Sequence, residues 1–217
     1  MQATAIIQGA GNPRKRWVES FVSAVLFMVV CLSWGTTWLG IKIAVESVPP
    51  LTSAGLRFLI AFPLFLGFAK LRRESIFFPR ENVGFFVFVT LAYFSIPYYL
   101  LNYGETYVSS GLTALLFSTM PVFILIFSAI LLHERIHLTQ VLGIAIGFGS
   151  LVMIVKSQGL LLNYAEALGV LAILAAAVMH ALCYVLTKKK GAAISVITFN
   201  TLPIGLAGAM LLVVGLW

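Results

Sequence analysis

The chain contains no aspartate, and charged residues of all kinds make up only 10% of its 217 positions. Soluble globular domains carry about 25% charged residues, so this shortage excludes an ordinary soluble fold. The first seventeen residues lack the apolar run and small-residue cleavage site of a signal peptide. Hydrophobic residues, in contrast, reach 61%. Together these features predict an all-α polytopic membrane protein.

Cysteine and histidine are also scarce, with two and three copies. Cys31 and Cys183 both lie inside apolar runs, where a cysteine most often serves as a small core residue. We therefore expect no cofactor and no bound metal ion.

Seven apolar runs are separated by short polar connections. A bilayer core requires about 20 mostly apolar residues per helix. The sequence therefore predicts seven transmembrane helices behind a polar N-terminal segment at 1–17. The runs cover residues 18–41, 51–70, 83–103, 109–131, 138–155, 165–187 and 194–217.

The net charge of +7 indicates membrane orientation rather than nucleic-acid binding, because the basic residues lie between the apolar runs. Basic residues are enriched in cytoplasmic loops. One side of the membrane holds only Lys42 and Lys156, so the N-terminus is expected in the cytoplasm, with the lipid bilayer and not a nucleic acid as partner. The other side holds eleven Lys and Arg residues, at 14–16, 70–80, 135 and 188–190.

An internal repeat relates the first and sixth runs. Residues 32–42, LSWGTTWLGIK, align with residues 178–188, VMHALCYVLTK, at an offset of 146. The same offset places Thr52 on Thr198 at the start of the following runs. Because the repeating unit holds five helices, an odd number, the second unit must cross the membrane in the opposite sense. Such inverted repeats are typical of secondary transporters.

Two longer segments resemble a known family. EamA-type members of the drug/metabolite transporter (DMT) superfamily open with a segment similar to AVLFMVVCLSWGTTWLGIKIAVESVPPLTSAGLRFLIAF in this chain. The family's third to fifth helices resemble NYGETYVSSGLTALLFSTMPVFILIFSAILLHERIHLTQVLGIAIGFGSLVMI, with Pro121 in the middle of the fourth and Glu134 at its end. The resemblance covers nearly everything after residue 18.

The resemblance implies ten helices in two inverted halves and a transporter of small organic metabolites, often an exporter, in the bacterial inner membrane. We therefore expect residues 18–155 to form the first EamA-like repeat and residues 165–217 to begin the second. Three further helices are expected beyond Trp217, and a homodimer is the other way to supply them. A seven-helix receptor or retinal-type protein remains an alternative, although residues 194–217 contain no lysine for retinal.

Residues 131–138, LLHERIHL, contain the H-E-x-x-H pattern, which binds zinc when both histidines share one helix face. An unbroken helix over 109–155 would be about 70 Å long at ~1.5 Å per residue, more than twice a hydrocarbon core of about 30 Å. Because only His133 to His137 are polar enough for the turn, we expect a loop here. Glu134 would then close the fourth helix and pair with Arg135 or the basic second loop. An intramembrane zinc metalloprotease is the less favoured alternative.

The candidate substrate site draws on several runs. Arg57 is the only clear charge inside a predicted span, and such charges face the bundle or a water-filled cavity unless they snorkel outward. An inverted repeat would bring one face of the first and sixth runs together near the midplane. Aromatic packing and a satisfied core histidine are the structural alternatives. The full set is Trp34, Trp38, Arg57, Tyr99, Asn102, Tyr103, Pro121, His180 and Tyr184.

No predicted span has a glutamate near its middle, and Glu105 is expected on the outer side, at the end of its run. Substrate recognition should therefore depend on aromatic and neutral polar side chains, as suits an amphipathic, amino-acid-like or drug-like molecule. In the fifth run, Gly143 and Gly147 form a GxxxG pattern that predicts a closely packed helix face within the bundle.

Overall fold

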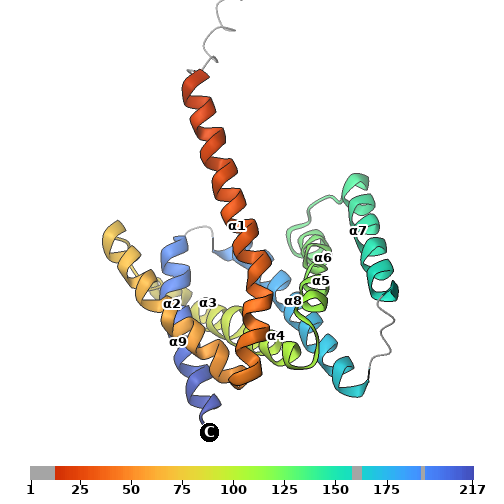
Figure 1. Cartoon of the computed structure of the whole chain (residues 1–217). Helices are drawn as coiled ribbons and strands as arrows, with labels where there is room; N and C mark the ends of the chain where they lie inside the picture. Colours follow the sequence, from red (N-terminus) through yellow and green to blue (C-terminus); the bar gives the residue numbers. More distant parts are fainter. Residues whose placement is uncertain (1–12, 158–162, 192–193) are drawn as a thin grey trace, which may run out of the picture.

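The computed structural model describes residues 13–157, 163–191 and 194–217, and all regular structure in these ranges is helical (Figure 1). Six helical stretches are long and apolar enough to cross a membrane, which confirms six of the predicted spans. The fifth predicted span is also a helix, but its apolar part, Leu138–Ser150, is shorter than such a crossing needs. The six stretches are Trp17–Ser47, Pro50–Arg72, Arg80–Tyr107, Ser110–Leu132, Tyr164–Lys190 and Val196–Gly215.

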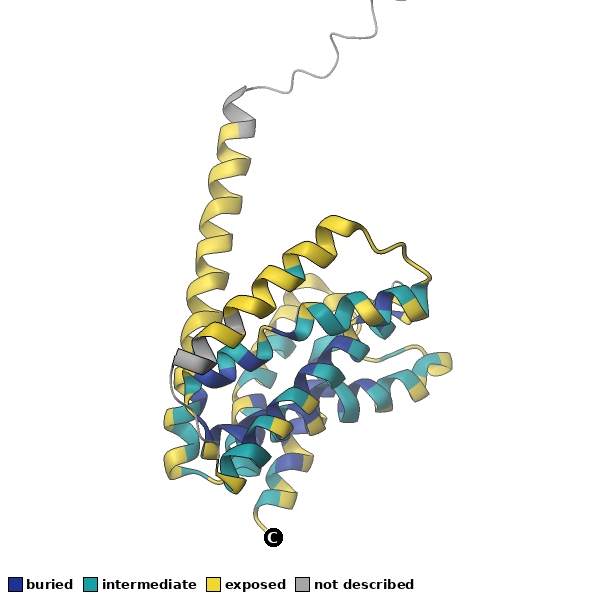
Figure 2. Cartoon of the chain, turned by 90° about the vertical axis from the view of Figure 1, so that its right-hand side faces the viewer, coloured by how far each residue is buried: buried dark blue, intermediate teal, exposed yellow. Residues whose placement is uncertain are grey.

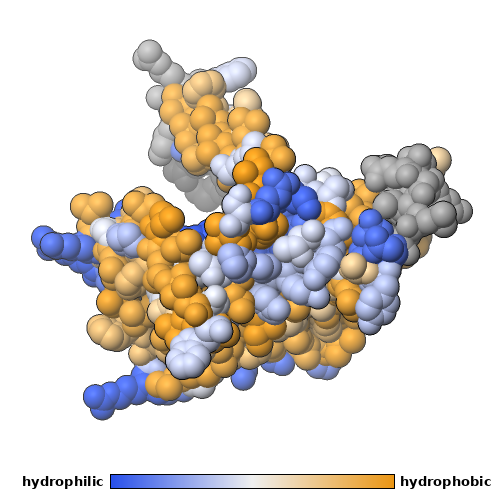
Figure 3. All heavy atoms as spheres, turned by 60° about the horizontal axis from the view of Figure 1, so that its bottom comes forward, coloured by the Kyte–Doolittle hydropathy of each residue, from blue (hydrophilic) through white to orange (hydrophobic). Residues whose placement is uncertain are grey.

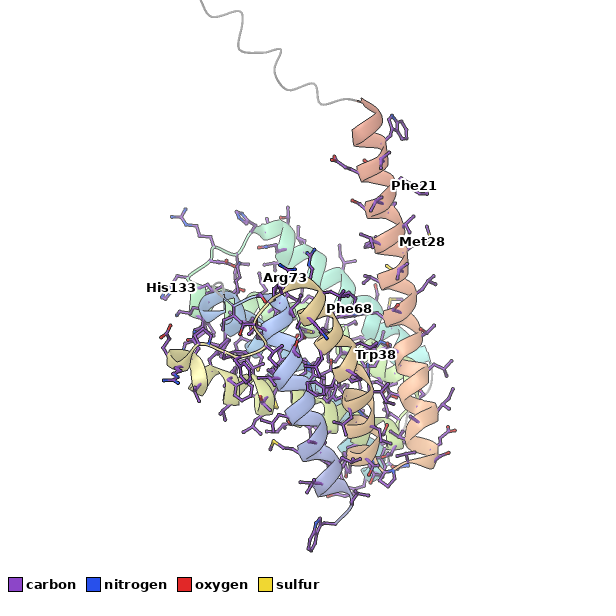
Figure 4. The ribbon with its side chains drawn as sticks, turned by 90° about the vertical axis from the view of Figure 1, so that its left-hand side faces the viewer. Phe21, Met28, Trp38, Phe68, Arg73 and His133 are labelled. Carbon is purple, nitrogen blue, oxygen red and sulfur yellow. The ribbon has the colours of Figure 1, made fainter. Side chains whose placement is uncertain are left out.

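Helix α1 (Pro13–Ser47) is longer at both ends than the predicted span 18–41. The polar segment predicted at 1–17 therefore ends earlier, and its residues 1–12 lie outside the described part of the chain. The N-terminal half of α1 stands clear of the other helices (Figure 1) and is exposed along its length (Figure 2). Phe21 and Met28 project from it into open space (Figure 4). Such an apolar surface is suited to lipid or to another helix rather than to water.

Helix α2 (Pro50–Arg72) begins with a proline, whose missing N–H is not needed in the first turn. Arg73 ends this helix with a left-handed backbone, at φ 55°. His133 ends α6 in the same way, at φ 56°. Both residues lie toward the same end of the bundle (Figure 4).

The third predicted span is a compound helix. It consists of η1 (Arg80–Asn82), α3 (Val83–Phe88), the π-helical segment η2 (Val89–Ser95) and α4 (Ile96–Tyr107). Pro97 accounts for the wide turn, because proline has no N–H and its ring clashes with the carbonyl four residues earlier. The Ile96 N–H instead bonds the Leu91 oxygen five residues back, and the Ser95 hydroxyl donates to the Thr90 oxygen at 2.8 Å.

The fourth predicted span is also interrupted. It divides into α5 (Ser110–Phe117) and α6 (Met120–Leu132), so Pro121 lies in the first turn of a new helix rather than in the middle of one. The hydroxyls of Ser118 and Thr119 donate to carbonyls three residues earlier, each at 2.6 Å. The Leu116 oxygen also accepts from the Thr119 N–H at 3.1 Å, so both carbonyls at the break have hydrogen-bond donors, as the membrane interior requires.

The remaining helices are α7 (Leu138–Ser157), α8 (Tyr164–Lys190) and α9 (Val196–Gly215). A capping box starts α8, in which Asn163 accepts from the Glu166 N–H and the Glu166 carboxylate accepts from the Asn163 N–H. The Ser195 hydroxyl caps α9 by accepting from Thr198. The Thr198 hydroxyl also bonds the Ser75 oxygen, which ties α9 to the α2–η1 loop.

Two pairs of helices form the core, and in each pair glycine allows the two backbones to approach closely. A Cβ on Gly55 of α2 would lie 2.8 Å from the Leu212 backbone nitrogen and 3.0 Å from the Gly208 oxygen of α9. A Cβ on Gly104 of α4 would lie 2.9 Å from the Gly169 oxygen of α8. The buried residues accordingly concentrate on these helices (Figure 2).

The prediction of a packed Gly143–Gly147 face is wrong. A Cβ on either glycine would meet no atom within 4 Å, and α7 lies at the edge of the bundle, away from the central pairs (Figure 1). The GxxxG spacing allows two backbones to approach but supplies no partner, and the close pairs are α2 with α9 and α4 with α8.

Replacing Gly55 by alanine is expected to lower the free energy of unfolding by about 1–3 kcal/mol, the usual cost of forcing an extra carbon into a packed contact. Gly67→Ala on the same helix is the matched control, because nothing lies within 4 Å of its Cβ position. The control should gain up to ~1 kcal/mol from helix propensity. Unfolding of the purified protein in detergent measures both. Equal stability of the two variants would contradict the close α2–α9 approach.

Candidate substrate cavity

An aromatic cavity of about 160 Å³ lies where α1, α2, α4, α5 and α8 meet. It brings together four of the predicted site residues, Trp34, Trp38, Arg57 and His180. Trp38 lies on the side of α1 that faces the bundle (Figure 4), and its ring is 5.0 Å from that of Phe117. Trp34, one turn earlier, is 64% exposed and lines only the edge. Tyr93, Tyr98, Phe117 and Met120 complete most of the wall.

His180 is buried among aromatic rings. The centroids of Tyr93, Tyr98 and Phe117 lie 5.4, 5.3 and 5.5 Å from its own. Its Nδ1 is 3.0 Å from the Ala176 oxygen, and because a carbonyl only accepts, Nδ1 must carry the hydrogen. One ring nitrogen is thus satisfied by the helix, which leaves Nε2 as the acceptor.

Arg57 lies between this cavity and a second hollow. Its guanidinium carbon is 5.5 Å from the centroid of the Tyr98 ring, a cation–π contact. It also lines a groove of about 490 Å³ between α1, α2 and α4. Among the residues that the structure describes, no carboxylate forms an ion pair with Arg57. The cation is therefore held by a ring face and remains available to an anionic group.

The other predicted candidates lie outside the aromatic cavity. Tyr99 and Tyr103 follow one another along α4, with ring centroids 5.9 Å apart. Asn102 is buried, donates to the Tyr98 oxygen at 2.7 Å and lines the groove. Pro121 and Tyr184 line a larger hollow of about 810 Å³ between α6, α7 and α8. The predicted set is therefore divided among separate sites.

Sequence reasoning missed Tyr93, Tyr98 and Phe117. The dense aromatic stretch AYFSIPYY was the available signal, but the wide η2 turn decides which of its rings face the cavity. Tyr98 rather than Tyr99 is the tyrosine that points to Arg57 and His180.

The HERIH segment is the predicted loop, since residues 133–137 have no helical structure. The two imidazoles therefore do not share a helix face, and the described residues contain no group of three or more metal-ligating side chains. The partner of Glu134 differs from the expectation of Arg135 or the second loop. Its Oε1 lies 2.6 Å from the Lys188 Nζ of α8, because the left-handed turn at His133 directs the chain toward the end of α8. Lys189 adds a bond to the Leu131 oxygen at 2.9 Å.

Glu105 lies in the last turn of α4, at the end of its span as expected, but its burial was not predicted. It is 0% exposed, and neither carboxyl oxygen has a hydrogen-bond partner among the described residues. The Lys42 Nζ donates to its backbone oxygen at 2.7 Å. A carboxyl group therefore lies buried within the bundle, contrary to the expectation that only Arg57 and His180 carry ionisable groups at depth.

Comparison with known proteins identifies the chain's relatives. Residues 22–156 match the EamA-like transporter family. Protein PagO of Salmonella typhimurium (strain LT2) is 41% identical over 192 residues, which cover 88% of this chain and 63% of that protein. An uncharacterized transporter of Buchnera aphidicola subsp. Schizaphis graminum is 37% identical over 201 residues, 91% of this chain and 66% of that protein.

A probable amino-acid metabolite efflux pump of Escherichia coli (strain K12) is 32% identical over 169 residues, 76% of this chain and 53% of that protein. The chain thus spans 53–66% of the length of these three relatives. No solved structure matches it. The family match covers more than half of the chain, and the chain therefore belongs to the EamA-like transporter family.

Proposed function

We propose that this chain is the larger part of a secondary transporter that exports small organic metabolites across the bacterial inner membrane by alternating access. The observation that carries the proposal is the aromatic cavity, in which side chains from α1, α2, α4 and α8 surround a small space beside an unpaired cation. Because the chain belongs to a transporter family, we no longer consider the zinc metalloprotease or the seven-helix receptor as alternatives.

The proposed architecture is a ten-helix inverted repeat. The offset of 146 relates α1 to α8 and α2 to α9, and members of these pairs meet in the structure: α2 packs against α9, while α1 and α8 both line the aromatic cavity. Substrate sites of inverted-repeat transporters lie at the interface between the repeats. The share of the relatives' length that the chain spans, 63–66% for the two most similar described above, is consistent with three further helices.

The proposed substrate is amphipathic and carries an anionic group, as amino acids do. Trp38 and Phe117 offer apolar surface, His180 offers Nε2, and Arg57 offers a cation for a carboxylate. The similarity to a probable amino-acid metabolite efflux pump of Escherichia coli supports this substrate class. We place the N-terminus in the cytoplasm and the Glu134–Lys188 pair at the inner face, where it closes the hollow that Pro121 and Tyr184 line.

Trp38→Ala and Arg57→Gln are expected to reduce the flux of radiolabelled neutral amino acids in proteoliposomes by about tenfold or more, since a loss of ~1.4 kcal/mol in binding is tenfold in affinity. Trp17→Ala and Arg73→Gln remove the same side-chain types from exposed positions and should leave flux unchanged. Wild-type flux in both cavity variants would show that the aromatic cavity is not the substrate site.

Glu134→Gln is expected to loosen the inner closure without changing the metal content. The probe is Tyr184→Cys in a Cys31→Ser background, labelled from the inner side by a membrane-impermeant thiol reagent. Because exposed ion pairs contribute about 0.2–1 kcal/mol, the labelling rate should rise by about two- to fivefold. The charge reversal Glu134→Lys with Lys188→Glu should restore the slow rate, and Lys190→Gln is the control. Zinc at one equivalent per chain, lost in His133→Ala, would overturn this assignment.

A further inference from the structure

The Glu105 carboxyl is enclosed by the protein itself. It lies near the end of α4, which packs against α1, α2, α5 and α8, and it is inaccessible even though part of the relatives' length is not present in this chain. Neither Oε1 nor Oε2 has a hydrogen-bond partner. An ionised carboxylate buried without partners is far more costly than a neutral acid, and such a group takes up a proton instead.

The Lys42 ammonium of α1 is a cation from another helix that contacts Glu105 directly. Its Nζ donates at 2.7 Å to the backbone oxygen of Glu105, one of the carbonyls that the end of α4 leaves without a helical partner. The ammonium is therefore hydrogen-bonded to the backbone of Glu105 and not to its carboxyl group. A change in Lys42 side-chain torsions would exchange one acceptor for the other.

The other charged and titratable groups near Glu105 lie on the helices packed around it. Arg57 of α2 is the second cation whose charge acts on Glu105, and it is held over the Tyr98 ring. The Glu166 carboxylate of α8 is bound in the capping box. Helix α5 has no titratable side chain. The other titratable side chains that the structure describes on the packed helices are Glu19, Cys31 and Glu46 of α1, Lys70 and Arg72 of α2, Tyr164, His180, Cys183, Tyr184 and Lys188–Lys190 of α8, and Tyr98, Tyr99, Tyr103 and Tyr107 of α4.

We propose that Glu105 is a proton-binding site and that Lys42 is its switch. With the proton bound, Glu105 is neutral and Lys42 keeps the bond to the backbone oxygen that the structure shows. When the proton leaves, the carboxylate draws the ammonium from the backbone oxygen into an ion pair. The charge of the pair is then zero, so the site never holds an uncompensated buried anion.

The switch is connected to the aromatic cavity through α1. The Lys42 bond joins α1 to α4, and Trp38 lies one turn from Lys42 on α1. Ile41, the residue before Lys42, lines both the aromatic cavity and the groove between α1, α2 and α4. The face turned toward the viewer in Figure 3 shows a cluster of hydrophilic residues among hydrophobic ones. This step rests on the proposed function: binding or release of the proton at Glu105 would be coupled to movement of α1 against α4.

Infrared difference spectroscopy of the protein in lipid tests the protonated state directly. The wild type is expected to show a protonated-carboxyl band at neutral pH that shifts in D₂O, disappears on raising the pH and is absent in Glu105→Gln. Glu46→Gln, which removes an exposed carboxylate from α1, should keep the band. In Lys42→Met the deprotonated form has lost its counter-ion, so the band should persist to a pH about one unit or more higher.

Two outcomes would overturn the proton site. One is the absence of a Glu105-dependent band in the wild type at neutral pH. The other is failure of Glu105→Gln to fold, because glutamine has the shape and neutrality of the protonated acid and should be tolerated if the site is neutral.

Coupling to transport is tested separately in proteoliposomes with radiolabelled phenylalanine and alanine. An imposed pH gradient should drive the wild type, whereas Glu105→Gln should retain exchange of these amino acids across the membrane and lose the response to the gradient. Wild-type flux that ignores the gradient would overturn the coupling. If neither amino acid moves while the infrared band is present, the proposed substrate class fails and the proton site stands.

Discussion

The close approach of α2 and α9 at Gly55 and Gly208 determines much of the arrangement around it. With the two backbones nearly in contact, the Phe58 side chain is placed beside Gly208 and directed into the bundle. Phe58 then meets the rings of Phe94 and Tyr98 at 5.8 and 4.7 Å. Because hydrophobic burial alone does not drive helices together in lipid, such close contacts are a main source of association energy. The glycines therefore matter far from their own positions.

The consequence reaches the cavity through Tyr98. Its ring contacts Phe58, Arg57 and His180. A shift of α2 would move Arg57 together with the aromatic surface that supports it. The same use of glycine, at Gly104 against Gly169, brings α4 onto α8 and buries Glu105. Packing that excludes lipid thus also creates the polar interior on which the proposed transport depends.

The sequence alone was sufficient to predict the features that the thickness of the bilayer determines. Hydrophobic length predicted six of the spans correctly. Because a membrane helix about 70 Å long is impossible, the HERIH segment was correctly predicted to be a loop. Helical spacing placed Trp38 and His180 on faces that meet in one cavity. These inferences depend on periodicity and length, which are properties of a single helix in its solvent.

The inferences that failed depended on contacts between helices. Nothing in the fifth run distinguishes Gly143 from Gly55, yet only Gly55 has a helix against it. Glu105 was judged by its distance from the end of an apolar run, but its burial follows from how α4 packs against its neighbours. Lys188 could not be identified as the partner of Glu134, because the left-handed turn at His133 directs that side chain.

The π-helical segment η2 also affects how this chain is to be aligned with its relatives. A π turn holds one more residue than an α turn, and each residue of an α-helix advances the side chains by about 100°. Losing one residue between Val89 and Ser95 would therefore restore an ordinary helix and leave the later side chains in their present directions, with Tyr98 toward Arg57 and His180. A relative that had an ordinary helix here without losing a residue would instead have every later side chain rotated by about 100° and would present a different ring to the same cavity.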